Sequence, residues 1–420
     1  MRRLFATTSV AALVAGVAVA ATPTVASAQA DPCAGAPRAP YVDVPDGSVH
    51  APAVDCLHGL RVIQGRLVDA YQPSSDVRRD QMATIVAGAI EAAGGRLPAG
   101  DASAFRDLHG NPHRQAIQQL AAAGIVQGKG DGRYDPGAAV PRGQMTAFLV
   151  GAHEFVTGRE VRDAPDAFRD DDGHAHEASI DKAVHLGLAE GRSSTRFDPQ
   201  ERTRRDQTAS FVTRLYRQLA ADRGTSGPSW GFEARTTALP DTLRRSMTGS
   251  SWRSGCPVGL DDLRLVELVH RDLRGTDRVG LLVVHRGVAG DVVHALRRGY
   301  EAGFRIERMR LVDHYGADDD RSMRNNNTHA FNCRRVAGSS NWSEHAYGRA
   351  LDINPIQNPY VRGSYVAPDA GRAYLDRSNV RPGMLTGDDA VVRAFKDRGW
   401  GWGGDWSSVK DYHHLSSTGR

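Results

Sequence analysis

The sequence lacks a strong excess of charge of either sign. Lys and Arg number 53 and Asp and Glu number 49, which gives a formal net charge of +4 over 420 residues. So small an excess gives no reason to expect a nucleic-acid partner. Beyond residue 30 there is no apolar run long enough to cross a bilayer, so a polytopic membrane protein is excluded. With 40% hydrophobic and 24% charged residues, the composition is that of a soluble globular chain with two or three domains.

Cysteines are few, and no two of them form a C-x-x-C pair. The four are Cys33, Cys56, Cys256 and Cys333. Their spacing argues against a structural zinc cluster. Four cysteines allow three pairings. Two of the cysteines lie near the N-terminus and the other two lie in the C-terminal half. We therefore predict the disulfides Cys33–Cys56 and Cys256–Cys333, formed in an oxidising compartment.

The first 30 residues have the order of an export signal. A basic head at Arg2 and Arg3 precedes an uncharged apolar stretch and then a run of small residues. This order predicts a secretory signal peptide over residues 1–30, cleaved after Ala28 or Ala30. The alternative is an uncleaved membrane anchor, which an Ala-rich and Leu-poor stretch disfavours. We expect a protein that is exported and released, or held outside the cell by binding.

A pattern recurs three times in the N-terminal half. Each copy has an aromatic-x-Asp start, a helical run closed by Gly, an aromatic-x-Pro turn and a second amphipathic helix that begins at an Arg. These arginines, Arg79, Arg142 and Arg205, follow one another at a constant interval of 63 residues. One such unit cannot bury its apolar face alone, but three packed around an axis can. The pattern predicts an all-α domain of pseudo-threefold repeats over residues 31–219.

The repeat resembles the S-layer homology (SLH) domain, over roughly Tyr41 to Leu219. The resemblance implies non-covalent binding to cell-wall polysaccharide in grooves between the copies. The family usually has Thr-Arg-x-Glu at the start of the second helix, whereas Gln81, Gln144 and Gln207 stand here in the place of Glu. The three repeated arginines either reach an anionic wall glycan, to which guanidinium groups are suited, or form salt bridges inside the helical bundle.

A linker and a second domain follow the repeats. Residues 220–235 are rich in Gly and Ser and predict a flexible linker. The region 236–420 then alternates between strand-like and helix-like patterns. We expect strands over 263–269, 280–285, 304–306 and 309–312, and a helix over 289–302. This order predicts an α+β domain with a mainly antiparallel sheet.

Two stretches of the second domain carry residues suited to metal chemistry. His345, Asp352 and His414 can supply two imidazoles and one carboxylate, the donor set of a catalytic site for one Zn²⁺ ion with an open position. His345 and Asp352 can meet only if the chain reverses between them, and Gly348 permits that reversal. The alternative is that His345 and Asp352 form an ordinary buried pair. Asp411, three residues before His414, is placed to exchange a proton with the attacking water, with Asp405 as its rival.

The motif Ser-x-His-x-x-Gly-x-Ala-x-Asp, followed by Trp-Gly-Gly-Asp-Trp and Asp-x-x-His, resembles that of the zinc D-alanyl-D-alanine carboxypeptidases of the VanY type. It is also similar to that of phage L-alanyl-D-glutamate endopeptidases of the same fold. The resemblance covers about residues 263–416 and implies His345, Asp352 and His414 as metal ligands, the last in preference to His413. It further implies Asp411 as general acid/base and an upstream arginine that polarises the scissile carbonyl. Arg334 is the candidate for that arginine and Arg335 its rival.

The sequence therefore predicts a secreted, wall-associated zinc peptidase that trims peptidoglycan stem peptides, most simply as a D-alanyl-D-alanine carboxypeptidase. The alternatives are an L-alanyl-D-glutamate-type endopeptidase and a non-catalytic wall-binding structural protein. Three tryptophans, Trp400, Trp402 and Trp406, line a substrate groove or belong to the core. Three further histidines have no partner at ligand spacing, and we expect them at the surface or at strand ends: His285, His314 and His329.

Overall fold

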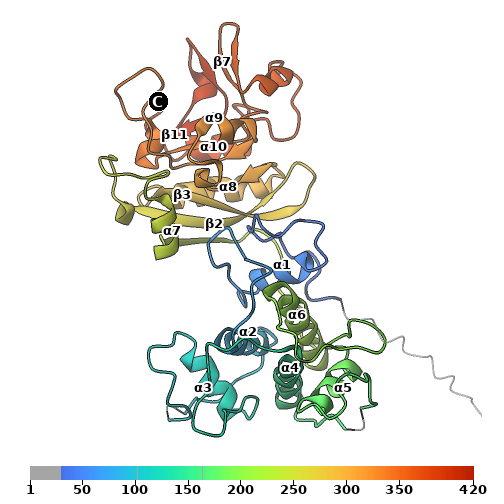
Figure 1. Ribbon diagram of the computed structural model, residues 1–420. Coiled ribbons are helices and arrows are strands. Elements are labelled where there is room, and N and C mark those ends of the chain that lie inside the picture. The colour runs from blue at the N-terminus through green and yellow to red at the C-terminus, as the bar shows by residue number, and fades with distance from the viewer. Residues whose placement is uncertain (1–29, 102, 163) are drawn as a thin grey trace, which may run out of the picture.

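A computed structural model describes residues 30–101, 103–162 and 164–420. The expected signal peptide, residues 1–30, therefore lies outside the described residues except for Ala30. Figure 1 shows a helical N-terminal half at the bottom, a three-stranded sheet in the middle and most of the remaining C-terminal elements above it. Within the described part of the chain, no helix combines the length and the apolar character needed to cross a membrane.

The N-terminal half consists of three successive pairs of helices. In chain order these are α1 (Ala51–Gly59), α2 (Arg79–Ala92), α3 (Arg114–Ala122), α4 (Arg142–Thr157), α5 (Glu177–His185) and α6 (Arg205–Asp222). The second helix of each pair begins at the repeated Arg, as predicted. These longer helices contribute many of the apolar residues of a single core that runs through all three pairs.

Each repeated Arg is buried and joins its own copy to another one. The Nε of Arg79 donates to the carbonyl of Tyr134 at 2.9 Å, and its guanidinium lies 4.4 Å from the centre of the Tyr134 ring. Arg142 makes the same two contacts with Phe197, and Arg205 makes them with Tyr71. The partners are carbonyls and aromatic rings rather than carboxylates. This placement favours a structural role for the three arginines over contact with a glycan.

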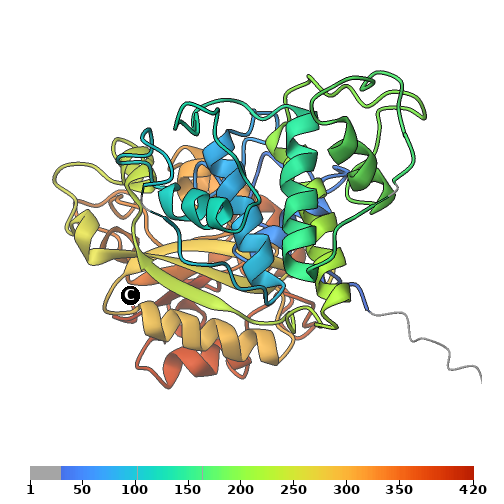
Figure 2. The ribbon, with the colours of Figure 1, turned by 90° about the horizontal axis from the view of Figure 1, so that it is seen from below.

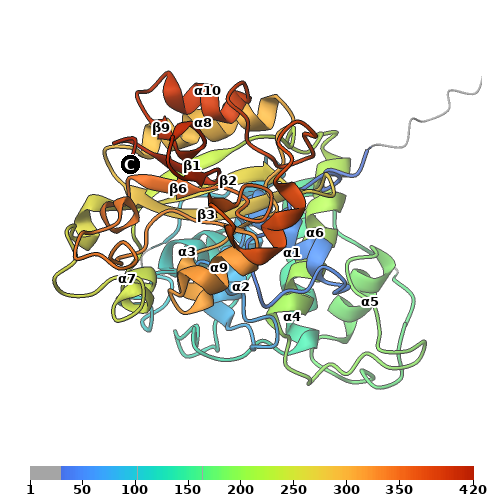
Figure 3. The same cartoon turned by 90° about the horizontal axis from the view of Figure 1, so that it is seen from above.

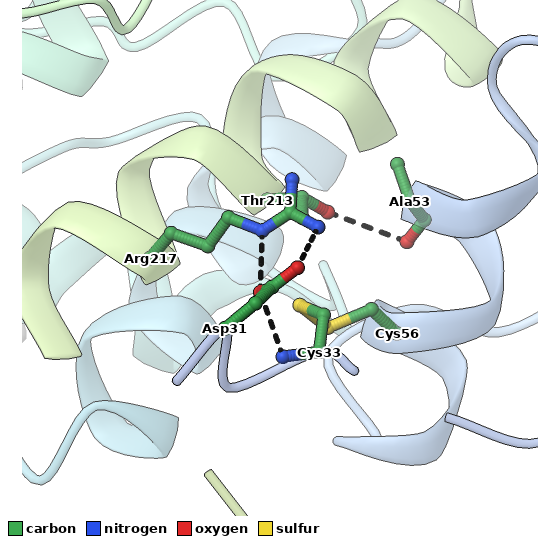
Figure 4. Close-up of a disulfide and its surroundings, with 6 residues drawn as sticks. All are labelled: Asp31, Cys33, Ala53, Cys56, Thr213 and Arg217. Carbon is green, nitrogen blue, oxygen red and sulfur yellow. Dashed lines mark hydrogen bonds and ion pairs between the residues drawn. A yellow bond between two sulfur atoms is a disulfide. The ribbon is translucent and has the colours of Figure 1, made fainter. Parts of the chain in front are cut away.

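Both predicted disulfides are present. Cys33–Cys56 fastens the first described residues to α1, and Figure 4 shows its surroundings. Next to it, Asp31 accepts two hydrogen bonds of 2.8 Å from Arg217 on α6. The N-terminal segment is thus tied to the last helix of the half. The second disulfide, Cys256–Cys333, lies in the C-terminal half.

The C-terminal half is built on one antiparallel sheet with an apolar surface on both faces. Its strands pair in the order β1 (Ala234–Ala238), β2 (Leu263–Arg271) and β3 (Asp277–His285). One face packs against α8 (Ala289–Glu301) and α10 (Ala390–Lys396), which lie side by side in Figure 3. The other face packs against α7 (Asp241–Met247) and Cys333. The predicted helix at 289–302 and both long strands are confirmed.

Short elements complete this half and carry the candidate site. They are α9 (Asp319–Arg324), β4 (Arg308–Met309), β5 (Asn327–Thr328), β6 (Ala350–Asp352), β7 (Tyr360–Arg362), β8 (Tyr365–Ala367), β9 (Gly401–Trp402), β10 (Lys410–Asp411) and β11 (His414–Ser416). All strand pairs between named strands are antiparallel except β4–β5, in agreement with the predicted α+β class.

The strand predicted over 304–306 and 309–312 is present only in part, since Arg305 forms an isolated bridge with Arg271 and Met309 belongs to β4. Only Arg308 and Met309 form a strand, and a 3₁₀ turn follows from Val312 to Tyr315. The apolar residues of this segment serve two different cores, because Met309 packs on the α8 side of the sheet and Leu311 on the α7 side. A segment that crosses between two cores needs apolar residues on both sides, so its sequence resembles that of a strand although most of it does not pair with another strand.

The two halves are in direct contact. The backbone of Arg38 pairs with β3, donating to the carbonyl of Asp277 at 2.9 Å, and Asp46 forms an ion pair of 2.6 Å with Arg278. The linker between α6 and β1 is packed, since its Trp230 lies so close to Gly59 that a Cβ there would be 2.6 Å from the indole ring. Figure 2, with the helical half nearest the viewer, shows the sheet directly behind it.

Candidate metal centre

Three elements bring the predicted ligands together. His345 lies in a 3₁₀ turn (Glu344–Tyr347), Asp352 is the last residue of β6 and His414 the first residue of β11. In the antiparallel pairing of these two strands, His414 stands directly opposite Asp352. Gly348 reverses the chain with φ +64°, and a Cβ there would lie 2.7 Å from the backbone nitrogen of His285. The reversal at this glycine is therefore confirmed, and both conformation and space require it.

The side chains converge on the carboxylate of Asp352. Nε2 of His345 lies 3.1 Å from Oδ2, and Nδ1 of His414 lies 3.0 Å from Oδ1. All three side chains are buried. The structure thus places the two imidazoles on different oxygens of one carboxylate.

The far nitrogen of each ring is held by a backbone carbonyl. Nδ1 of His345 lies 2.6 Å from the oxygen of Ala330, and Nε2 of His414 lies 2.8 Å from the oxygen of Arg420. These main-chain oxygens can only accept, so the far nitrogens carry protons. Each near nitrogen can donate to Asp352 when it is protonated, or present a lone pair to a metal ion when it is not. Two imidazoles and a carboxylate are donor types that Zn²⁺ takes, and the group of ligand atoms within 4.8 Å of one another here is that of His329, His345 and Asp352.

Burial and charge act against each other at this centre. Burial alone would raise the pKa of Asp352, but His345 and His413 overcome it and hold that pKa well below its usual range. Burial likewise disfavours the charged form of His414, yet its hydrogen bond to Asp352 raises its pKa. The pKa of His345 is lowered because burial prevails there. The carboxylate is therefore ionised, as a metal ligand must be.

His413, the neighbour of His414 in the sequence, also faces the centre. Nε2 of His413 lies 2.9 Å from Oδ1 of Asp411 and 3.8 Å from Oδ2 of Asp352. Its Nδ1 lies 2.8 Å from the carbonyl oxygen of Asn358. Burial favours the neutral ring, but Asp411 and Asp352 outweigh it and raise the pKa of His413 to about 10. His413 therefore links the predicted acid/base residue to the metal ligands.

The two candidates for the acid/base residue differ in their surroundings. Asp411 ends β10, with its carboxylate beside His413. Asp405 is about half exposed and forms an ion pair of 2.7 Å with Lys396 on α10. This geometry favours Asp411. Gly403 makes room for it, since a Cβ there would lie 2.4 Å from the carbonyl oxygen of Asp411.

His329 directly follows β5, as expected of a strand-end residue, but it does not lie at the surface. His329 is buried, and its ring stacks on that of His345 with centroids 5.2 Å apart. One ligand atom each of His329, His345 and Asp352 lies within 4.8 Å of the others. A backbone bridge between His329 and Asp352 creates this proximity. The spacing of residues in the sequence could not predict that His329 lies at the centre, because His329 and Asp352 meet only through the backbone bridge between their segments.

Arg334 approaches the centre through an acidic partner. Oδ2 of Asp319, the first residue of α9, lies 2.8 Å from Nη2 of Arg334, and its Oδ1 lies 3.2 Å from Nε2 of His329. Burial would raise the pKa of Asp319, but His329 and Arg334 lower it strongly. Arg335, by contrast, is exposed and stacks 3.6 Å over the ring of Trp342. The structure thus favours Arg334 over its rival.

The three tryptophans divide between the two predicted roles. Trp400 and Trp402 are buried in the core beneath α10. Trp406 is half-buried, and its ring centre lies 5.7 Å from that of His414. Only Trp406 is therefore available to line the centre.

Comparison with protein families confirms both resemblances. Residues 337–417 match the family described as D-alanyl-D-alanine carboxypeptidase. Residues 104–146 and 167–209 match the S-layer homology domain. The first match includes all three predicted ligands and Asp411, and the second covers segments of the second and third copies of the repeat.

Several curated proteins are similar to part of the chain. An endoglucanase of Bacillus sp. (strain KSM-635) is 27% identical over 43% of this chain, and an S-layer protein of Bacillus licheniformis is 25% identical over 59%. An uncharacterized cell wall amidase of Bacillus anthracis is 24% identical over 31%. The chain spans only 19%, 26% and 24% of the lengths of these three relatives.

Proposed function

We propose that the protein is an exported, wall-attached zinc peptidase that hydrolyses peptidoglycan stem peptides as a D-alanyl-D-alanine carboxypeptidase. In this proposal residues 31–219 bind the wall, 220–235 connect the halves and 236–420 carry out the hydrolysis. The observation that carries it is the convergence of His345, Asp352 and His414, with the near nitrogens of both imidazoles turned to one buried carboxylate. The match of residues 337–417 to the carboxypeptidase family supports the same reaction.

The residues of the centre have distinct roles. His345, Asp352 and His414 hold the ion, and Ala330 and Arg420 orient the two imidazoles through their carbonyls. When bound, Zn²⁺ supplies Lewis acidity that makes water nucleophilic near neutral pH and polarises a carbonyl. Asp411 accepts the proton of the attacking water and returns it to the leaving amine nitrogen.

Arg334 supplies the positive charge on the substrate side of the centre. Its Nε has no hydrogen-bond partner among the described residues, while its Nη2 is held by Asp319. A guanidinium fixed at one end offers its remaining N–H groups to the oxygen that gains charge during attack on the peptide bond. Asp319 acts as a positioning residue, because it touches Arg334 and not the reacting atoms.

The helical half forms, in this proposal, a wall-binding unit of three copies with pseudo-threefold symmetry. The support is the repeated set of contacts made by Arg79, Arg142 and Arg205 together with the two SLH matches. A wall-binding unit raises the local concentration of stem peptides around a tethered active site.

The exposed guanidinium groups near the junctions between copies belong to the preceding residues. Arg78 and Arg204 are each about two-fifths exposed and pair with Asp80 and Asp206, respectively. A hydroxyl–imidazole pair accompanies each of them, Thr84 with His113 and Ser210 with His50, both at 2.8 Å. The middle copy has Pro141, Gly143 and Ala147 at the corresponding positions. In this proposal the glycan contacts fall at the first and third of these helix starts.

The test is to incubate the full mature chain with a defined stem pentapeptide and to identify the products by mass spectrometry. We expect release of the terminal D-alanine, loss of that activity on chelation and its recovery with zinc. Cleavage between L-alanine and D-glutamate would replace the carboxypeptidase assignment by the endopeptidase. No cleavage at any zinc loading, in a protein that still binds purified cell walls, would leave only the structural wall-binding role.

A further inference from the structure

The third copy of the repeat has a carboxylate where the other two have an apolar side chain. The start of each copy reads aromatic-x-Asp, and the next residue is Val44, Leu108 or Asp171. Val44 and Leu108 pack against the core of the helical half. Asp171 is fully buried, at 0% exposure, and neither of its carboxylate oxygens has a hydrogen-bond partner among the described residues. A buried carboxylate without partners is costly unless something absent from the chain itself satisfies it.

Further acidic groups surround this carboxylate. One carboxylate oxygen each of Asp166, Asp171 and Asp172 lies within 4.8 Å of the others. Asp181 on α5 adds its charge from the neighbouring helix, with Oδ1 accepting from the backbone of Ala167 at 3.0 Å. Burial, together with the charges of Asp181 and Asp166, raises the pKa of Asp171 to about 6. The cluster therefore repels itself at neutral pH.

The corresponding position in the first copy shows how such a charge is otherwise balanced. Asp55 on α1 occupies the place of Asp181 and is paired at 2.5 Å with Arg38. Among the described residues, Asp181 has no such ion pair. The side-chain charges that raise its pKa are those of Asp166, Glu177 and Asp172, after the larger effect of burial. The third copy thus has the acidic residue without the arginine.

We propose that the loop from Asp166 to Gly173 binds a calcium ion through the carboxylates of Asp166, Asp171 and Asp172. Several carboxylate oxygens gathered in one loop, without nitrogen or sulfur donors, are the ligands that Ca²⁺ prefers. Gly173, with φ +74°, closes the turn in which the backbone nitrogen of His174 donates to the carbonyl of Asp171. The ion neutralises the buried carboxylate and fastens the loop against α5. This site is separate from the zinc centre and does not depend on the proposed hydrolysis.

The experiment measures calcium binding by titration calorimetry and the midpoint of thermal unfolding, Tm, of the helical half of the full chain. The protein is first saturated with zinc in a buffer that contains no calcium, and calcium is then added, so that calcium does not act at the zinc centre. We expect one calcium ion per chain and a Tm higher by about 5 °C or more at a hundredfold excess over the dissociation constant. An unchanged Tm and no binding at millimolar calcium would overturn the proposal.

Two variants decide whether Asp171 carries the binding. Asp171→Leu restores the residue of the second copy, and we expect it to lose the calcium response and to be at least as stable as the wild type without calcium. Asp171→Asn keeps the shape and loses the charge, and it should bind calcium at least tenfold more weakly. Asp101→Asn, which removes an exposed carboxylate just before the second copy, is the matched control and should respond like the wild type. Wild-type binding in both Asp171 variants would refute the site.

Discussion

His414 faces Asp352 across the paired strands β6 and β11, with Nδ1 of the imidazole 3.0 Å from Oδ1 of the carboxylate. The pairing of the backbones places these side chains together, and His345 approaches the other oxygen of the same carboxylate. One carboxylate thus organises the whole donor set.

Replacing that carboxylate should remove the metal. We expect Asp352→Asn to retain less than about a tenth of the wild-type zinc and to lose at least about 10²-fold in kcat/KM, since a neutral amide is a poor zinc ligand. Metal analysis of the purified protein and peptide-cleavage rates measure the two effects. Glu344→Gln, in the same turn as His345 but outside the donor set, is the control. Full zinc content in Asp352→Asn would contradict the proposed ligands.

The two candidate bases can be separated by matched substitutions. Asp411→Asn removes the carboxylate beside His413, and we expect kcat to fall by about 10²–10⁴-fold because proton transfer is lost. Asp405→Asn breaks only the exposed pair with Lys396, and we expect kcat close to that of the wild type. Steady-state kinetics at matched zinc content measures both. The reverse ranking would assign the role to Asp405.

Arg334 and Arg335 can be separated by matched substitutions in the same way. Arg334→Ala removes the guanidinium held by Asp319, and we expect kcat/KM to fall by about 10²–10³-fold with zinc content unchanged. Arg335→Ala loses the stacking on Trp342, which affects stability by only about 1 kcal/mol and should leave kcat/KM nearly unaltered. Equal losses in the two variants would argue against a specific role of Arg334.

The buried arginines of the repeat should act on stability rather than on wall binding. We expect Arg205→Met to lower the free energy of unfolding by about 2–4 kcal/mol, because it leaves the carbonyls of Tyr71 and Gln64 without a donor. Urea unfolding measures this loss. Arg202→Met, which breaks an exposed ion pair with Asp76, should change it by less than about 0.5 kcal/mol.

Co-sedimentation with purified walls then tests the glycan role of the same arginine. Measured well below its unfolding temperature, Arg205→Met should bind like the wild type. Loss of wall binding with unchanged stability would instead support direct contact between Arg205 and the glycan.

Acid should destabilise the C-terminal half through His270. This histidine is buried on β2, its Nδ1 lies 2.9 Å from the carbonyl oxygen of Ile306, and burial lowers its pKa to about 4. The ordinary pKa in an unfolded chain is about 6.5. The fold therefore prefers the neutral ring, and its contribution is complete above pH 6.5 and is lost as the pH falls toward 4.

The size of this loss approaches about 3 kcal/mol. Urea unfolding at pH 7 and near pH 4.5 measures it, and His270→Gln should show a smaller difference between the two pH values. An identical pH dependence in the variant would show that other groups govern acid sensitivity.

Much of the local structure follows from the sequence because it depends on neighbouring residues. The arginines at helix starts, the turn at Gly348 and the strands β2 and β3 are set by conformational preference and by the spacing of apolar residues. The pairing Cys256–Cys333 was predictable because these two cysteines lie in the same half of the chain. The motif also predicted that His345 and Asp352 meet, whereas their role as metal ligands with His414 stays a prediction.

The tertiary structure alone decided which polar groups would be buried and by what they would be satisfied. We expected Arg79 to reach a glycan or to form a salt bridge, but its guanidinium contacts the carbonyl and the ring of Tyr134. His329 lies at the centre through its backbone bridge to Asp352. Asp171 stands in a core position with no hydrogen-bond partner among the described residues. The sequence by itself determined the elements and the chemistry of the ligands, because both depend on residue type and on short spacing. Burial, partners and charge balance depend on what other segments bring to the same place, and only packing settles that.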